Sequence, residues 1–325
     1  MTDNSPTEPA SLRPPQPPTP APDAFTIHRA PVADDISLAY VREGTGGYPL
    51  LLLHGFPETK RIWWRNIEPL VAAGFEVIVP DLRGSGDSDL SAADEYDLAV
   101  YSIDVHTLVT ETLGHSEVGA IAGDIGGVVA VDLCHRFAGF VSKMIFFNTV
   151  APTAGDQPEW YADRGLDMNP LPDTPSGDYR IRQGRDHEAL RAELDTPERC
   201  RRYVHEFYEH RLWASPFSFS EADIEFMTEP FADIERLAAS WAPYQLQYGR
   251  PFKEIPLIAP TDTPTMVLYG PDDHAVPDDF AKRCEVAFPN RVGPLVVPES
   301  GHFLQWERAD ILNDLAALFF AELRR

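Results

Sequence analysis

The chain has 325 residues, and its 27 Lys and Arg against 51 Asp and Glu give a formal net charge of −24 at pH 7. Such an excess of carboxylates repels phosphate backbones, which argues against binding to nucleic acids. With 43% hydrophobic and 24% charged residues, the composition is that of a folded chain able to bury a sizeable core.

The apolar runs and the cysteines favour a cytoplasmic protein without membrane segments. Runs such as residues 50–53 and 144–147 are far shorter than the roughly 20 apolar residues of a spanning helix. The N-terminus lacks the basic and then apolar pattern of a secretory signal. Cys134, Cys200 and Cys284 are widely spaced and odd in number, which predicts neither a disulfide framework nor a zinc site.

Residues 1–24 are expected to form a disordered, proline-rich tail. Eight of the 31 prolines fall between Pro6 and Pro22, and large apolar side chains are almost absent there. Such a segment buries too little apolar surface to offset the entropy lost on ordering it. We therefore expect a disordered, partly extended tail, and the alternative interpretation is a ligand for a proline-recognition domain.

From residue 25 onward, strand-like and helix-like segments alternate, which predicts an α/β fold with helices on both faces of the sheet. Residues 25–29 and 36–42 indicate a strand pair, and the later strand candidates are short apolar runs typical of a parallel sheet buried on both faces. These later strands are expected at residues 50–54, 76–80, 118–123, 143–148, 265–269 and 294–297. Helices are expected at residues 61–73, 98–113, 127–137, 278–288 and 304–323.

The alternation stops after Asn148 and resumes near Thr263. The interval is rich in Trp, Tyr and Phe and contains helix-like stretches at 186–194 and 198–212. We therefore predict a helical cap inserted into the sheet domain. The expected boundaries are 25–150 for the first part of the core, 151–260 for the cap and 261–325 for the second part of the core.

A sharp turn from strand to helix is indicated at residues 120–129 (AIAGDIGGVV). Small residues around Asp124 permit such a turn, because a Cβ at those positions would clash. A turn of this kind holds one side chain above the carboxyl edge of the sheet, as a nucleophile elbow does. The sequence Gly-x-Ser-x-Gly is absent from the chain, which argues against a serine hydrolase. The competing interpretation is that Asp124 only caps the following helix.

The motif LLLHGFP at residues 51–57 predicts a loop that faces this turn. The backbone N–H of Phe56 and that of Ile125 are candidates for an oxyanion hole, in which N–H donors stabilise a developing negative charge. His54 lies in the same loop and is interpreted as a structural histidine, because a second histidine suits a catalytic role better.

That second histidine is His302 in SGHFLQWE, between a strand and the last helix, where it could act as general base. The motif YGPDDHAVP at residues 269–277 supplies Asp273, with Asp272 as the alternative, to orient the imidazole. The order Asp124, Asp273, His302 is that of nucleophile, acid and histidine in the α/β-hydrolase fold. Each of the three follows a predicted strand, where open parallel sheets build their sites.

These motifs, together with HGFPETKRIWWR and VPDLRGSGDSD, resemble the epoxide hydrolase and dehalogenase branch of the α/β-hydrolases over residues 25–148 and 263–325. The resemblance implies a mostly parallel, doubly wound sheet with an inserted helical cap, and no cofactor or metal. It also implies that an aspartate attacks a substrate carbon and that a histidine-activated water cleaves the resulting ester.

Details of the resemblance favour Asp273 over Asp272, because Gly270, Asp273 and Pro277 match the family spacing. Some relatives place the acid one strand earlier, where this chain has Asn148, which cannot serve. The sequence departs from the family before the nucleophile. It has Ala122 and Gly123 where Gly-His is usual.

The resemblance also bears on the electrophile. Haloalkane dehalogenases usually have a tryptophan after the nucleophile, and haloacid relatives have nearby arginines, but Ile125 and Val128 offer no such group. Epoxide hydrolases of this branch use two cap tyrosines as proton donors. Here the candidates are Tyr179 and Tyr244. Tyr161 could take the place of Tyr179, and Tyr248 that of Tyr244. Three further residues are expected to have structural roles in the cap, although one of them could replace a tyrosine as donor: Trp213, His205 and His210.

The sequence therefore predicts an epoxide hydrolase that acts on a small apolar epoxide and water. One alternative is a haloalkane or haloacid dehalogenase with the same nucleophile and a halide site at Trp213 or Trp160. A second alternative is a non-catalytic protein that binds small molecules on this scaffold. A homodimer is left open by the sequence.

Overall fold

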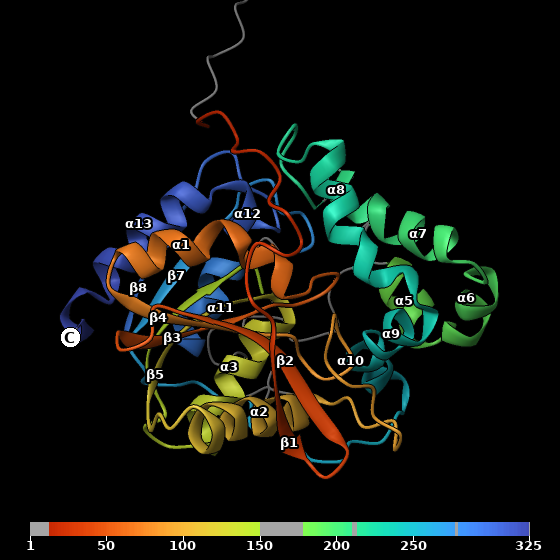
Figure 1. The fold of residues 1–325 in the computed structure, drawn as a ribbon, viewed down its shortest axis with the longest axis horizontal. Coiled ribbons are helices and arrows are strands. Elements are labelled where there is room, and N and C mark those ends of the chain that lie inside the picture. Colours follow the sequence, from red (N-terminus) through yellow and green to blue (C-terminus); the bar gives the residue numbers. More distant parts are fainter. Residues whose placement is uncertain (1–12, 150–177, 210–212, 277–278, 325) are drawn as a thin grey trace, which may run out of the picture.

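The computed structural model describes residues 13–149, 178–209, 213–276 and 279–324, built around one eight-stranded sheet (Figure 1). The sheet order is β1-β2-β4-β3-β5-β6-β7-β8. Strand β2 is antiparallel to β1 and β4, and the other neighbours are parallel. The strands are β1 His28–Ala33, β2 Ile36–Glu43, β3 Tyr48–Leu53, β4 Phe75–Pro80, β5 Val118–Gly123, β6 Val141–Phe147, β7 Thr265–Tyr269 and β8 Arg291–Val296. This mostly parallel sheet confirms the predicted fold class.

Alternation of side chains along the central strands supplies two hydrophobic cores. In β3, Leu50 and Leu52 belong to the core on one face of the sheet, and Leu51 and Leu53 belong to the core on the other. Helices cover both faces (Figure 1), which is why these strands are apolar throughout rather than in alternation. The helices of the sheet domain are α1 Trp64–Ala72, α2 Leu98–Thr107, α3 Asp124–Arg136, α11 Phe280–Ala287, α12 Leu304–Glu307 and α13 Ala309–Phe319.

The predicted helices occur with altered ends. A 3₁₀ turn precedes α1, and a π-helical turn at Leu108–Thr112 extends α2. The expected C-terminal helix is divided into α12 and α13, because the backbone of Arg308 leaves the helical region at φ −132° and ψ 50°. Its guanidinium binds Asp310 and the carbonyl of Pro298.

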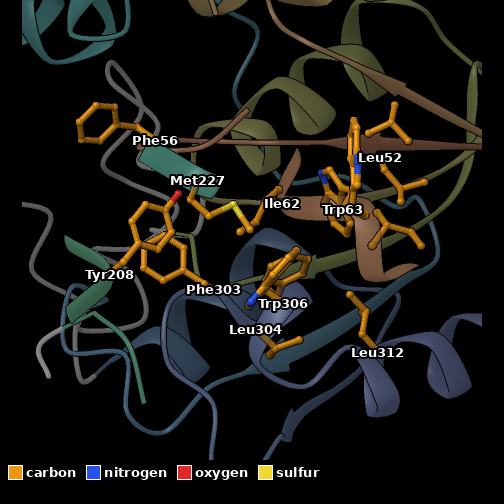
Figure 2. Close-up of a cluster of buried hydrophobic side chains, with 14 of the residues drawn as sticks. Leu52, Phe56, Ile62, Trp63, Tyr208, Met227, Phe303, Leu304, Trp306 and Leu312 are labelled. Carbon is orange, nitrogen blue, oxygen red and sulfur yellow. The ribbon is translucent and has the colours of Figure 1, made fainter. Parts of the chain in front are cut away.

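A helical insertion lies between β6 and β7, as the sequence predicted, and forms a cap beside the sheet domain (Figure 1). Aromatic packing fixes the cap on the core. Tyr208 stacks on Phe303 with ring centroids 4.4 Å apart, and the two lie side by side in Figure 2. The cap helices are α5 Asp178–Gly184, α6 His187–Glu193, α7 Pro197–Glu209, α8 Glu221–Thr228, α9 Ile234–Ala239 and α10 Ala242–Gln245.

The described part of the N-terminal segment, residues 13–24, lies against both core and cap, which differs from the expected disordered tail. Gln16 accepts a hydrogen bond from Arg65 of α1 at 2.6 Å, and Thr19 donates one to Asp223 of α8 at 2.7 Å. Arg13 donates to the carbonyl of Glu299 at 2.5 Å. Because proline already restricts the backbone, ordering this segment costs less entropy than ordering an average one, and polar contacts suffice to hold it.

Candidate active site

Asp124 stands at the turn from β5 to α3 with a left-handed backbone, φ +47°. A non-glycine residue is strained in this region, and such strain is concentrated at functional sites. The turn is tight: a Cβ on Gly126 would lie 2.6 Å from the carbonyl oxygen of Leu53. The N-cap position belongs to Gly123 rather than to Asp124. The Asp124 carboxylate is therefore not the cap of α3, and it is directed toward the loop after β3.

That loop provides the N–H donor that the sequence predicted. The N–H of Phe56 donates to Asp124 Oδ1 at 2.7 Å. The loop approaches so closely that a Cβ on Gly55 would lie 2.3 Å from the same oxygen. Ile125 is in the first turn of α3, where backbone N–H groups have no acceptor within the helix. The Phe56 N–H thus contacts the Asp124 carboxylate, and the N–H of Ile125, the residue after Asp124, has no acceptor within the helix.

His302 and Asp273 complete a buried row of three side chains. The Nδ1–H of His302 donates to Asp273 Oδ2 at 2.9 Å, and Nε2 lies 3.5 Å from Asp124 Oδ2. Nε2 has no hydrogen-bond partner among the described residues. Burial lowers the pKa of His302, but the charge of Asp273 and the nearby Asp124 carboxylate outweigh it and raise the pKa well above the usual value. A free ring nitrogen therefore faces the Asp124 carboxylate.

The alternatives considered from the sequence occupy other places. Asp272 accepts from the Ser215 hydroxyl at 2.6 Å and so contacts the cap. Asn148 links the loops that follow β7 and β8. Its amide nitrogen donates to the Gly301 carbonyl at 2.5 Å, and its amide oxygen accepts from Gly270 N at 3.0 Å. Neither side chain takes the place that Asp273 has beside the imidazole.

His54 is fixed within its own loop. Its Nδ1 contacts the Gly55 carbonyl at 3.0 Å, and its Nε2 accepts from Leu82 N at 3.0 Å. Burial lowers its pKa, so the ring is held neutral, with both nitrogens occupied. This geometry agrees with the structural interpretation of His54.

Tyr179 of α5 and Tyr244 of α10 face each other across the cap side of the site, with ring centroids 5.4 Å apart. Burial raises the pKa of both phenols, so both stay protonated. The two hydroxyls are hydrogen-bonded to each other. The Asp124 carboxylate raises both pKa values, and the cation of Arg180 lowers both. The pair therefore lies within electrostatic reach of the Asp124 carboxylate.

Among the other aromatic and histidine candidates of the cap, Trp213 contacts the site. Its ring lies 4.8 Å from the His302 ring and 4.9 Å from the Tyr179 ring, measured between centroids. Tyr248 is 44% exposed, and the His205 ring contacts the Glu209 carboxylate along α7 at 3.2 Å. Trp160, Tyr161, His210 and Pro277 lie outside the described residues.

Two buried glutamates next to the site were not singled out by the sequence. Glu58 accepts from Gly55 N at 2.8 Å and from the Gln305 amide at 2.7 Å, and burial raises its pKa to about 7. Glu307 is also buried with its pKa raised to about 7, and it accepts from backbone N–H groups around His302. Glu58 lies in HGFPETKRIWWR and Glu307 in SGHFLQWE, but nothing in either motif shows that its glutamate is buried.

Within the described ranges, no three His, Cys, Asp or Glu side chains gather as metal ligands would. None of the described helices is both long and apolar enough to cross a bilayer.

Comparison with known proteins places this geometry in context. A family model for the alpha/beta hydrolase fold matches residues 48–309. A soluble epoxide hydrolase of Corynebacterium sp. (strain C12) is 38% identical over 128 residues, which are 39% of this chain and 42% of that protein. Epoxide hydrolase 4 of Mus musculus is 26% identical over 297 residues, 88% of this chain and 77% of that protein. The solved structure of the epoxide hydrolase CorEH without ligand has a TM-score of 0.75 at 26% identity, covering 92% of this chain and 100% of that one.

Proposed function

The chain belongs to the α/β-hydrolase family, and from that premise we propose that it hydrolyses epoxides to vicinal diols through an ester on Asp124. One observation carries the proposal: the Asp124 carboxylate lies beside the His302–Asp273 pair, and two buried phenols pack on the neighbouring rings, Tyr244 on Phe56 and Tyr179 on Trp213. A carboxylate nucleophile, a base for a second step and acids for an oxygen leaving group are the groups that epoxide hydrolysis requires.

In the first step, an Asp124 oxygen attacks an epoxide carbon and the bond from that carbon to the ring oxygen breaks. The ring oxygen takes a proton from Tyr179, whose pKa burial raises and the cation of Arg180 partly lowers again. The products of this step are an ester on Asp124 and a Tyr179 phenolate, which solvent reprotonates. The nucleophile needs no activation, because a carboxylate is already ionised at neutral pH.

In the second step, His302 Nε2 takes a proton from water, and the oxygen of that water attacks the ester carbonyl carbon. The N–H groups of Phe56 and Ile125 stabilise the oxyanion of the tetrahedral intermediate. The intermediate then expels the diol oxygen, which receives the proton from His302. This leaves Asp124 as a carboxylic acid, which loses the second proton of the water to solvent and so balances the proton that Tyr179 took up in the first step. Asp273 holds the imidazole in orientation and stabilises the transient imidazolium. The sum is one epoxide and one water converted to one diol.

An intact-mass experiment on the His302→Gln variant tests the proposal, because loss of the base should trap the ester. The variant is incubated separately with styrene oxide, 1,2-epoxyhexane, 1-bromobutane and chloroacetate. We expect a mass gain equal to a whole epoxide, since nothing leaves when the ring opens. Peptide mapping should locate the adduct on Asp124, and the Asp124→Ala, His302→Gln double variant should show none.

Other outcomes contradict the proposal in distinguishable ways. A gain equal to the haloalkane or haloacid minus hydrogen halide, with no epoxide adduct, indicates a dehalogenase. Absence of any adduct, together with ligand binding that is unchanged in Asp124→Asn, indicates a binding protein. Diol formation by Asp124→Ala at the wild-type rate removes Asp124 from the mechanism.

A further inference from the structure

A fully buried carboxylate lies directly behind the loop that carries His302. Glu307 is the last residue of α12, and its exposed fraction is 0%. Burial raises the pKa of its carboxyl to about 7, although the hydrogen bonds that it accepts oppose this shift. A buried carboxylate is tolerated only when donors replace its water. The identity of those donors therefore indicates what the side chain does.

Two of the donors are the residues on either side of His302. Gly301 N donates to Glu307 Oε2 at 3.0 Å, and Phe303 N donates to Oε1 at 3.0 Å. One carboxylate thus binds the backbone immediately before and immediately after the histidine. Another donor, Ser215 N, donates to Oε2 at 2.8 Å and comes from the cap insertion.

The cap segment at residues 213–215 runs beside this loop. The N–H of His302 donates to the Trp213 carbonyl at 2.6 Å. The two backbones are so close that a Cβ on Gly301 would lie 2.2 Å from that carbonyl oxygen. The Trp213 ring packs against both the His302 ring and the Tyr179 ring. Through Ser215, Glu307 therefore also holds the segment that joins the base to a cap phenol.

We infer that Glu307 is a positioning residue. It orients the His302 imidazole toward Asp124 and holds the cap segment at residues 213–215 against the His302 loop. This inference rests on the proposed function. In that mechanism ring opening uses Asp124 and the phenols, whereas ester breakdown alone uses His302 as a base. Loss of Glu307 should therefore slow ester breakdown much more than ester formation.

The test compares the two steps in full-length Glu307→Gln, using the epoxide that labels His302→Gln fastest. Rapid quenching followed by intact-mass measurement gives the rate of ester formation and the rate of its breakdown. Because a displacement of ~1 Å can cost about 100-fold in rate, we expect the ratio of breakdown to formation to fall at least about tenfold. The ester should accumulate during turnover in this variant, and Glu307→Asp should give an intermediate ratio.

Asp132→Asn is the matched control for loss of a buried carboxylate. Asp132 is 0% exposed and accepts hydrogen bonds from Arg136 and from Leu257 N, without contact to the His302 loop. This variant should lose stability and keep the wild-type ratio. The inference is overturned if Glu307→Gln slows both steps equally or keeps the wild-type ratio.

A second perturbation keeps the inference testable if Glu307→Gln does not fold. Gly301→Ala separates the loop from the Trp213 carbonyl directly, so the same fall in the ratio is expected, and an unchanged ratio overturns the inference. Failure of the proposed function looks different, because His302→Gln would then form no epoxide adduct at all.

Discussion

The arrangement of the two phenols leads to a prediction about unequal roles. The two hydroxyls are hydrogen-bonded to each other, so only one of the two protons is free to move to an epoxide oxygen. We assign that proton to Tyr179, because its ring lies 4.9 Å from the Trp213 ring, which in turn packs on His302. Tyr179→Phe removes a general acid, and such acids contribute about 10²- to 10⁴-fold in rate. We therefore expect ring opening to slow at least about 100-fold in this variant.

Tyr244→Phe removes only the hydrogen bond to Tyr179. A hydrogen bond to a group that becomes charged contributes about 1.5–3 kcal/mol, which corresponds to roughly 10- to 150-fold in rate. Because Tyr244 acts through Tyr179, the double variant should be little slower than Tyr179→Phe alone. Two residues that act as a unit are expected to be strongly non-additive in this way.

The assay is single-turnover ester formation, followed by rapid quenching and intact mass in a His302→Gln background. Tyr248→Phe is the control, since Tyr248 is 44% exposed and should give the parent rate. The assignment of unequal roles is refuted if Tyr244→Phe is slower than Tyr179→Phe. It is also refuted if the double variant shows the product of the two single effects, which would mean that both phenols donate independently.

Three further predictions concern charges. Arg180→Met should slow ring opening, because its cation lowers the pKa of both phenols, and Arg180→Lys should recover part of the rate in the same single-turnover assay. Ester breakdown should slow as the pH falls through the pKa of His302, since the base must be neutral. Asp273→Asn removes a charge that raises this pKa. In a pH series of breakdown rates, this variant should therefore lose activity at a lower pH than the wild type and reach a lower maximal rate. Arg65→Met should lower the free energy of unfolding by about 3–5 kcal/mol, because it leaves the buried Asp223 carboxylate unpaired, and urea titration should show partial recovery when Asp223→Asn is added.

The strands and the general place of the site could be predicted because their signals are local. Apolar runs buried on both faces identify the strands, and residues directly after parallel strands converge at one edge of the sheet. Asp124, Asp273 and His302 each follow a strand, and the structure brings the three together. The separation of Asp272 from Asp273 is harder to predict, because adjacent residues in a turn point in different directions.

Contacts between distant segments were not predictable in the same way. The segment of residues 13–24 is held through Arg65 and Asp223, and no local pattern shows that these residues lie together. Glu307 likewise reads as an ordinary helical glutamate until the fold buries it beside Ser215. Burial of a polar group is a property of the whole fold, which is why both features needed the structure.

The charge on Asp124 links the two steps of the proposed reaction. In the free protein, His302 lies between Asp273 at 2.9 Å and Asp124 at 3.5 Å, and these carboxylates raise its pKa against the effect of burial. Esterification removes the negative charge of Asp124, which had stabilised the imidazolium. The cost of burying that cation is then less well compensated, so the pKa of His302 falls. The imidazole thereby becomes a neutral base when an ester is present to be cleaved, while Asp273 stays ready to stabilise the imidazolium. The buried position of His302 is therefore useful in this mechanism, because it makes the proton affinity of the base respond to the state of the nucleophile.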